Sequence, residues 1–474
     1  MWYSELSNQR LWKLFNDISA VPRESGNEKG IREFLLGWAK EQGLEAKADK
    51  TGNVVIYCPA TPGLEDYPAI ALQGHMDMVC VKTAESSHDF LKDPIEIYVD
   101  GPVIRAKGTT LGADNGIAIA TILDIFSDKD AQHGPLEGIF TISEETGMDG
   151  AFGIDPSLVH ARRMVNLDSE EEGIIYTGCA GGENVEATLK LKWTDPAGEA
   201  VKVTVSGLLG GHSGSEIHRE RGNAIKILAR YLMRLPVFQL ASINGGSRSN
   251  VIPSSAEALI TVADTAKAME IAEELQKELS NELKDSDPGV KLTVAEAKLP
   301  SEVLKRKLSY QIAEALYLAP HGVECVNRAV DVVETSDNLA TVAIKDNKLR
   351  IHFSVRSTVE SKKHLQADRI ATLMEALGFK SEILGEYPAW EPSRDPAFRD
   401  EVVKAYKEIT GKEPQVMIMH AGLECGILNS IIPGMDSLSL GPELRDVHSV
   451  NENLNIASAE RVSAFVKRML VLLK

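Results

Sequence analysis

Five short motifs, far apart along the chain, contain histidine or carboxylate side chains that can bind metal ions. They are Gly74-His75-Met76-Asp77, Gly112-Ala113-Asp114-Asn115-Gly116, Ser143-Glu144-Glu145, Asn166-Leu167-Asp168 and Asp446-Val447-His448. Together they supply two histidines and three carboxylates as ligands, with two further carboxylates beside them, and this mixture of donors suits zinc. Two metal ions about 3.5–4 Å apart form a hydrolytic device, because they activate a water and stabilise the developing oxyanion. The residue types therefore indicate a two-metal hydrolase.

The first two motifs have residue spacings that suit this chemistry. At the end of an extended strand, His75 and Asp77 point the same way, so Asp77 can hydrogen-bond one ring nitrogen while the other binds metal. The two oxygens of Asp114 can bridge two cations, and the flanking glycines let the backbone come close. Taken alone, the first pair also fits a surface turn, and Asp114 also fits a helix cap.

The remaining motifs add acids and a second imidazole. Glu144 and Glu145 are neighbours and can point different ways, one to a metal and one to a water as general base. An exposed acidic turn is the ordinary alternative for this pair, as a solvated acidic run is for Asp168 and a surface loop for His448. The occurrence of all five motifs in one chain favours the metal interpretation over these separate explanations.

Composition limits the classes of protein to which the chain can belong. Its 474 residues are enough for two or three domains, and 43% hydrophobic with 25% charged residues is ordinary for a globular protein. A formal charge of −18 speaks against a nucleic-acid or anionic-membrane partner. We see no signal peptide and no apolar run long enough for a membrane span. Five cysteines without CxxC spacing indicate reduced thiols, so we expect a cytoplasmic protein.

The order of apolar segments predicts an α/β fold with a mixed, largely parallel sheet. Short apolar runs at residues 54–57, 69–72, 139–142 and 164–167 read as buried strands, and a helix is expected over about 117–126. Most of the motifs follow these runs by a few residues. Open α/β sheets place their sites outside the carboxyl ends of the strands, so the motif residues should share one edge of the sheet.

The pattern changes after about residue 182. Alternating apolar and polar residues predict solvent-facing antiparallel strands, and a similar arrangement of strands and helices recurs from about residue 291. We therefore predict an inserted α+β lid domain at 183–390, made of two similar halves. Because His448 lies after the insertion, the catalytic domain would be discontinuous, comprising 1–182 and 391–474.

As a set, the motifs resemble those of the di-zinc metallopeptidases of the aminoacylase/carnosinase type, over the whole length of the chain. The resemblance rests on Gln73-Gly74-His75-Met76-Asp77-Met78-Val79, Gly108-Thr109-Thr110-Leu111-Gly112-Ala113-Asp114-Asn115-Gly116, Ser143-Glu144-Glu145-Thr146-Gly147-Met148, Asn166-Leu167-Asp168-Ser169-Glu170, Gly210-Gly211-His212-Ser213-Gly214 and His448-Ser449-Val450-Asn451-Glu452.

The resemblance implies a role for each metal-site residue. His75 and Asp168 would bind one zinc ion, Glu145 and His448 the other, and Asp114 would bridge both. Asp77 would orient His75, and Glu144 would be the general acid/base that serves a metal-bridging water. Cobalt or manganese are conceivable substitutes for zinc. The resemblance also implies a cis peptide bond between Asp114 and Asn115.

Within the inserted region, the resemblance implies residues that hold the substrate. His212 would stabilise the oxyanion, and Arg356 would hold the substrate carboxylate, to which its forked guanidinium is suited. Asn250, Thr335 and Gly422 are weaker candidates for contact with the peptide. An exposed strand position is the alternative for Arg356, and a flexible loop is the alternative for His212.

The expected function is hydrolysis of unblocked dipeptides, including Xaa-His and β-Ala-His types. A fixed carboxylate anchor and recognition of the free amino group would together limit substrate length. An N-acyl amino acid amidohydrolase on the same scaffold and a non-catalytic metal- or peptide-binding protein are the alternatives. The resemblance suggests a homodimer, although the doubled lid would also suit a monomer.

Overall fold

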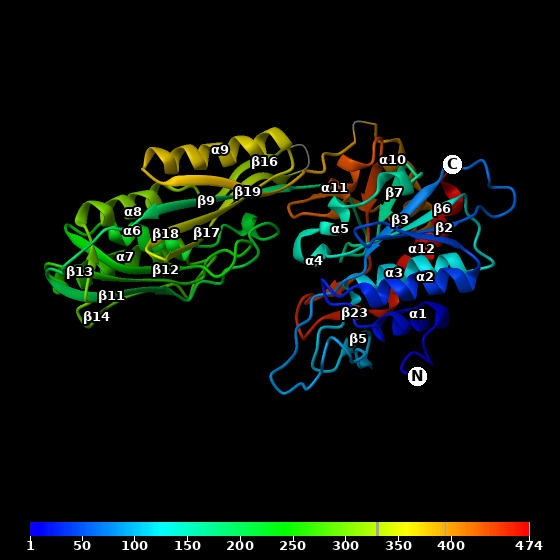
Figure 1. Cartoon of the computed structure of the whole chain (residues 1–474), viewed down its shortest axis with the longest axis horizontal. Coiled ribbons are helices and arrows are strands. Elements are labelled where there is room, and N and C mark those ends of the chain that lie inside the picture. Colours follow the sequence, from blue (N-terminus) through cyan, green and yellow to red (C-terminus); the bar gives the residue numbers. More distant parts are fainter. Residues whose placement is uncertain (329–330, 394, 474) are drawn as a thin grey trace. The chain divides into compact units, whose positions relative to one another are not determined.

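The chain, described here by a computed structural model over residues 1–328, 331–393 and 395–473, forms two compact units (Figure 1). Unit 1 comprises Met1–Gly178, Trp390–Ile418 and Leu423–Lys474, and unit 2 comprises Cys179–Ala389 and Met419–Gly422. The chain passes between the units within a few residues of positions 182/183 and 390/391, where the sequence analysis puts its domain boundaries. The sequence contains no signal for the short segment Met419–Gly422 in unit 2.

The main sheet of unit 1 has the strand order β1-β2-β6-β3-β7-β21-β8-β20. Its central strands β6, β3, β7 and β21 pair in parallel, whereas β1–β2, β2–β6 and β21–β8 are antiparallel. The strands are Glu45–Ala48 (β1), Val54–Cys58 (β2), Ile70–His75 (β3), Leu136–Thr141 (β6), Arg163–Asn166 (β7), Ile174–Cys179 (β8), Gln415–Met419 (β20) and Asp436–Ser439 (β21). Every residue of β3 and β6 is buried, as expected for strands covered on both faces. The predicted mixed α/β architecture is confirmed, with parallel pairing among the four central strands.

Helices bury the faces of this sheet. The helix α3 is buried on nearly all sides and packs against β3 and α1, which with α2 lies on the same side of the sheet (Figure 1). The helices are Gln9–Ser19 (α1), Lys29–Gln42 (α2), Ala113–Ser127 (α3), Glu144–Gly147 (α4), Asp149–Phe152 (α5), Ala397–Thr410 (α10), Glu424–Ile431 (α11) and Ile456–Leu472 (α12). A smaller antiparallel sheet has the order β22-β23-β5-β4, formed by Leu444–Arg445, Asn453–Asn455, Val103–Ala106 and Ile97–Asp100.

Unit 2 is built on one antiparallel sheet of order β14-β11-β13-β12-β17-β18-β9-β19, with β16 paired to β17. Between β12 and β17 only Asn244↔Ala343 and Gly245↔Val342 are in register among the described residues, so this junction is short. The strands are Gly181–Lys190 (β9), Glu199–Ser206 (β11), Phe238–Gly245 (β12), Ala256–Val262 (β13), Lys291–Glu296 (β14), Gly322–Asn327 (β16), Val332–Lys345 (β17), Lys348–Ser357 (β18) and Lys380–Tyr387 (β19). A separate ribbon pairs Trp193–Thr194 (β10) with Val303–Leu304 (β15).

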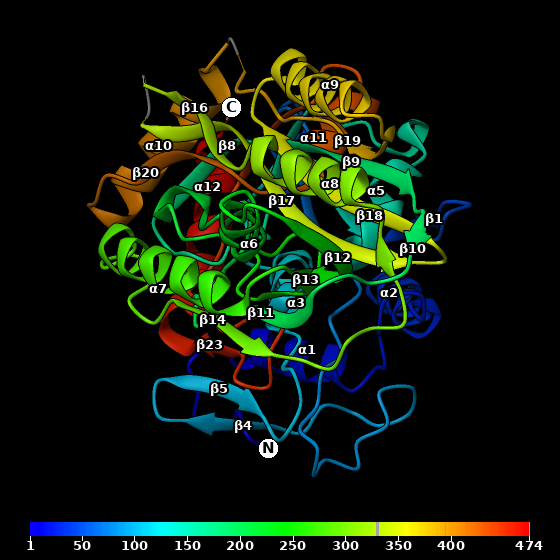
Figure 2. The same ribbon diagram turned by 90° about the vertical axis from the view of Figure 1, so that its left-hand side faces the viewer.

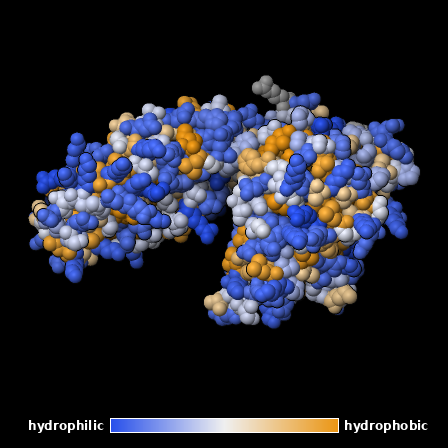
Figure 3. Space-filling view, in the orientation of Figure 1, coloured by the Kyte–Doolittle hydropathy of each residue, from blue (hydrophilic) through white to orange (hydrophobic). Residues whose placement is uncertain are grey.

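The helices of unit 2 share one apolar core with this sheet (Figure 2). They are Ala224–Leu232 (α6), Thr265–Glu282 (α7), Arg306–Leu318 (α8) and Glu360–Ala376 (α9). Side chains of Asn223 and Asp264 cap α6 and α7 by accepting backbone N–H groups of the first turn. Hydrophilic residues predominate on the molecular face drawn in Figure 3. Among the described helices, none combines the length and the apolar composition that crossing a lipid bilayer requires.

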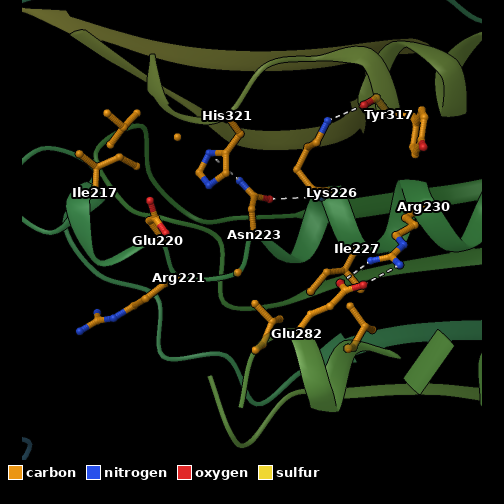
Figure 4. Close-up of a pocket in the computed structure, with 15 residues that line it drawn as sticks. Ile217, Glu220, Arg221, Asn223, Lys226, Ile227, Arg230, Glu282, Tyr317 and His321 are labelled. Atoms are coloured by element: carbon orange, nitrogen blue, oxygen red, sulfur yellow. Dashed lines mark hydrogen bonds and ion pairs between the residues drawn. The ribbon is translucent and has the colours of Figure 1, made fainter. Parts of the chain in front are cut away.

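A cavity of about 500 Å³ in unit 2 lies beside α6, and several of the polar groups that line it already have partners (Figure 4). Lys226 donates hydrogen bonds to the carbonyl oxygens of Leu316, Tyr317 and Ala319, at the C-terminal end of α8. The amide of Asn223 lies 3.3 Å from Nδ1 of His321. Burial, and then the positive charge of Lys226, lower the pKa of His321 to about 4. The ring is therefore neutral at pH 7 and accepts the amide hydrogen.

The depressed pKa of His321 predicts a loss of stability in acid. Between about pH 6.5 and about pH 4 the unfolded chain binds a proton at this ring that the folded chain refuses, so the free energy of unfolding falls as pH drops through this window. We expect about 1–3 kcal/mol to be lost in this way. Urea unfolding of His321→Gln should show a shallower decline than the unaltered protein, and His218→Gln, at an exposed position of the same unit, is the matched control. Equal slopes for all three proteins would contradict the assignment.

Candidate active site

Three parallel strands bring motif residues to one edge of the unit 1 sheet. β3 pairs with β6 on one side and with β7 on the other, all in parallel. His75 is the last residue of β3, Glu144 and Glu145 open α4 shortly after β6, and Asp168 follows β7 by two residues. Because the carboxyl ends of parallel strands meet at the same edge, these side chains converge.

Asp114 lies between the two histidines and uses one oxygen for each. Its Oδ1 is 3.0 Å from Nε2 of His75, and its Oδ2 is 3.1 Å from Nε2 of His448. The same nitrogen of His448 is 2.9 Å from Oε2 of Glu145, and Nε2 of His75 is 3.4 Å from Oδ1 of Asp168. Two histidine–carboxylate groups thus share one central carboxylate, and the ligand atoms of His75, Asp114 and Glu145 lie within 4.8 Å of one another.

Asp77 holds two parts of this arrangement. Its Oδ1 is 3.3 Å from Nδ1 of His75, on the side of the ring away from Asp114. Its two oxygens also accept the backbone N–H groups of Glu144, at 3.1 Å, and Glu145, at 3.2 Å, at the start of α4. Burial alone would raise the pKa of Asp77, but the hydrogen bonds from His75 and from these donors lower it to about 2. Asp77 is therefore a fixed anion that orients both the imidazole and the acidic pair.

The imidazoles are strongly favoured in their protonated form. Burial alone would lower the pKa of His75, but the charge of Asp168 and contacts with Asp114 and Asp77 raise it well above its ordinary value. Hydrogen bonds to Asp114 and Glu145 raise the pKa of His448 to about 11. The carboxylates around each ring thus stabilise a positive charge, which a proton or a metal ion can supply.

Two acids of the cluster have raised pKa values. Burial raises the pKa of Asp168 to about 6, although His75 opposes this shift. Burial also raises the pKa of Glu144 well above its ordinary value, and the negative charges of Asp168 and Glu145 act in the same direction. A carboxyl group with a raised pKa can exchange protons near neutral pH, as a general acid/base must.

Asn115 braces the segments that carry three of these residues. The Asp114–Asn115 peptide bond is cis, as the family resemblance implies. The side-chain oxygen of Asn115 accepts the backbone N–H of His75 at 3.2 Å, and its amide donates to the carbonyl of Leu167 at 3.1 Å. A Cβ on Gly74 would lie 2.3 Å from this oxygen, so the glycine of the first motif makes room for Asn115.

A second constellation lies within unit 2 around Arg356. This arginine is 8% exposed, its Nη1 donates to the hydroxyl of Tyr387 at 2.6 Å, and its Nε has no hydrogen-bond partner among the described residues. A Cβ on Gly214 would lie 3.2 Å from that Nε and 3.0 Å from the ring of His212, so Gly214 lies beside both predicted residues. A buried guanidinium without a carboxylate partner suits a bound anion.

His420, which the sequence analysis does not assign to the site, belongs to the same constellation. Its Nε2 lies 2.7 Å from the hydroxyl of Ser336, the residue opposite Arg356 in the β17–β18 ladder. Burial, and then the positive charge of Arg356, lower the pKa of His420 to about 3, so the ring is neutral. No spacing in the sequence signals this contact, because His420 and Arg356 lie on segments far apart in the chain.

The three weaker substrate-contact candidates differ in their surroundings. Gly422 lies against the ring of Tyr387, where a Cβ would be 2.9 Å from Cε2. Asn250 is exposed, and its backbone carbonyl accepts the N–H of Ser213. The hydroxyl of Thr335 contacts Ser357 at 2.9 Å, on the face of the sheet opposite to Arg356. The structure thus does not bring the Thr335 side chain together with Arg356.

A second group of potential metal-binding side chains comprises Glu183, His364 and Glu386, and its carboxylates already lie beside the ammonium group of a lysine. The buried ammonium of Lys363 lies 3.3 Å from Glu386 and 3.8 Å from Glu183. It also donates to the carbonyl of Tyr387. Because this lysine supplies the compensating charge, we read the group as a structural ion-pair network.

Comparison with known proteins identifies the family of the chain. The chain matches the model of peptidase family M20/M25/M40 over residues 71–471. It is 40% identical over 465 residues to the cytosol non-specific dipeptidase of Escherichia coli (strain K12), covering 96% of each chain. Its fold superposes on the crystal structure of aminoacylhistidine dipeptidase from Vibrio alginolyticus with a TM-score of 0.88 and 36% identity, covering 99% of this chain and 98% of the other. A tripeptidase from Staphylococcus aureus shares the fold, with a TM-score of 0.58, 17% identity and 99% of each chain covered. The chain therefore belongs to peptidase family M20/M25/M40.

Proposed function

We propose that the chain is a dipeptidase that uses two divalent metal ions. The observation that carries this proposal is the position of Asp114, whose two oxygens face His75 and His448 separately at 3.0 and 3.1 Å. His75 and Asp168 would hold one ion, Glu145 and His448 the other, and Asp114 would bridge them. This set of imidazole and carboxylate donors fits zinc, with cobalt or manganese as substitutes.

The charges of the cluster fit two cations. Four carboxylates surround the two imidazoles, and both rings have pKa values raised above their ordinary range. Two divalent ions would provide the positive charge that these carboxylates otherwise draw from protons, and would leave both rings neutral as ligands. Metal binding should therefore release protons and become weaker in acid.

The reaction assigned to this site is hydrolysis of a peptide bond. When bound, the two ions would lower the pKa of a water molecule and polarise the scissile carbonyl. Glu144 would take the proton of the attacking water and pass it to the leaving amine, and its raised pKa suits both transfers. Asp77 would keep His75 oriented and, through its bonds to the start of α4, keep Glu144 in place.

Unit 2 would supply recognition of the substrate. Arg356, whose Nε has no partner within the described chain, would bind the free carboxylate of the peptide. His212 would stabilise the oxyanion, and Gly422 and Asn250 would contact the peptide backbone. Requirement for both a free carboxylate and a free amino group would restrict the enzyme to short, unblocked peptides, including Xaa-His and β-Ala-His types.

The cellular location of the chain is inferred from the same similarity. The E. coli relative is named a cytosol dipeptidase, and we infer a cytoplasmic location for this chain as well. We propose a homodimer as its assembly, with the monomer as the alternative that size measurement in solution would detect.

Activity on a small panel tests the function, including its metal requirement. The zinc-loaded protein should cleave β-Ala-His and Gly-Gly but neither a tripeptide nor N-acetyl-His, because both ends of the substrate are recognised. Treatment with a chelator should abolish turnover, and zinc, cobalt or manganese should restore it. Cleavage of N-acetyl-His alone would move the assignment to an N-acyl amino acid amidohydrolase. Absence of any cleavage would favour a metal- or peptide-binding protein.

Replacement of the proposed acid/base separates chemistry from metal binding. Glu144→Gln should lower kcat for dipeptides by about 10²–10⁴-fold, because the amide cannot carry the proton, while zinc affinity stays close to that of the unaltered protein. The neighbouring variant Glu145→Gln is the matched comparison, since loss of a ligand should weaken zinc binding itself. Turnover and zinc affinity are measured for both. Retention of kcat in Glu144→Gln would remove Glu144 from the mechanism.

A further inference from the structure

Glu452 is a buried carboxylate whose partners are backbone groups of the segment that leads into Asp114. Its Oε2 accepts the N–H groups of Leu111 at 2.8 Å and Gly112 at 3.0 Å. Its Oε1 accepts those of Ala113 at 2.8 Å and Asp114 at 3.4 Å. The residue is 3% exposed, and its carboxyl group faces the N–H dipoles of successive backbone units. Glu452 therefore fixes the path of residues 111–114.

Arg23 makes the complementary contacts to backbone carbonyl groups. Its Nη1 donates to the carbonyl oxygens of Met76 at 3.1 Å and Asp77 at 3.0 Å, and its Nη2 donates to the carbonyl of Gly112. The side chain is 2% exposed, and the negative charges of Glu452 and Asp77 attract it. Arg23 thus ties the segment after His75 to the segment before Asp114, two segments that are far apart in sequence.

The glycines of the second motif make room for this arginine. A Cβ on Gly112 would lie 2.6 Å from Nη2 of Arg23 and 2.7 Å from the sulfur of Met78. A Cβ on Gly116 would lie 2.7 Å from the same Nη2. Gly112 also has a φ of +69°, which other residues rarely adopt. Both glycines therefore leave room for the guanidinium of Arg23, which lies 89 positions before Gly112 in the chain.

We propose that Arg23 and Glu452 are positioning residues that hold Asp114 and His75 in the geometry needed for metal binding before any metal arrives. The inference rests on the proposed function, in which Asp114 and His75 are ligands. We call Arg23 and Glu452 together the clamp. It is needed because the carboxylates of the metal site repel one another, and the backbone segments that carry them would move apart without these two anchors. Neither residue touches the ligand atoms directly, so each acts through the backbone that carries a ligand.

Zinc affinity and hydrogen exchange together test the clamp. In Glu452→Gln, the amide NH₂ would face backbone N–H donors, so zinc affinity, measured by competition with a chelator, should fall about 10–100-fold. Arg23→Lys should act in the same direction, because an ammonium cannot reproduce the fork over three carbonyls. In zinc-free protein, the amides of residues 111–114 should exchange faster in Glu452→Gln, whereas those of α7 should not change. The controls are Glu408→Gln and Arg468→Lys, at exposed positions of α10 and α12.

The outcomes separate this inference from the proposed function. Absence of zinc binding by the unaltered protein would overturn the two-metal site, and exchange at residues 111–114 would still decide whether the clamp exists. Normal zinc affinity and normal exchange in a folded Glu452→Gln would overturn the clamp alone. A merely structural role would lower the unfolding midpoint but leave the zinc affinity of the folded protein unchanged, which would also overturn it. If Glu452→Gln does not fold, Arg23→Lys and Glu452→Asp carry the same comparison.

Discussion

Repulsion between carboxylates is the dominant constraint on unit 1. Two unit charges 4 Å apart interact by about 4 kcal/mol at an effective dielectric constant of 20. Asp114, Glu145 and Asp168 lie close together around the two histidines, and their burial strengthens the repulsion between them. In the structure, positively charged or polar groups surround the carboxylates of the site. The two imidazoles are drawn toward the protonated form, and the backbone N–H groups at the start of α4 turn toward Asp77. The three parallel strands that end together make this concentration of charge possible.

Unit 2 has the opposite chemistry at its own candidate site. Arg356 is buried beside the hydroxyl of Tyr387 and has no carboxylate for a partner among the described residues. Burial and then the charge of Arg356 lower the pKa of His420, which stays neutral. A buried cation of this kind is suited to bind an anionic group of a ligand, in contrast to the carboxylate cluster of unit 1.

The sequence predicted correctly those features that depend on residues close together in the chain. Apolar runs predicted the strands that became β2, β3, β6 and β7, and the helix expected over 117–126 is α3. The residue types of the motifs indicated the donor set that meets at the strand ends. The contribution of Glu452, Arg23 and Tyr387 could not be predicted in this way, because these side chains act on backbone groups or on partners distant in sequence. The side chain of Thr335 illustrates the same limit, since the face on which it lies depends on the register of β17 with β18.

The glycines of the motifs are explained both by their neighbours in the sequence and by residues distant in the chain. Sequence reasoning assigned the glycines beside Asp114 to close approach of the backbone to metal ions. The structure gives them another reason: Gly112 and Gly116 border the guanidinium of Arg23, and Gly74 borders the amide of Asn115. In each case the space that a side chain would need is filled by a group that holds a proposed ligand in place. The small residues of the motifs therefore serve the supporting network, while the acids and histidines serve the chemistry. Substituting one of these glycines should displace the support before it displaces a ligand.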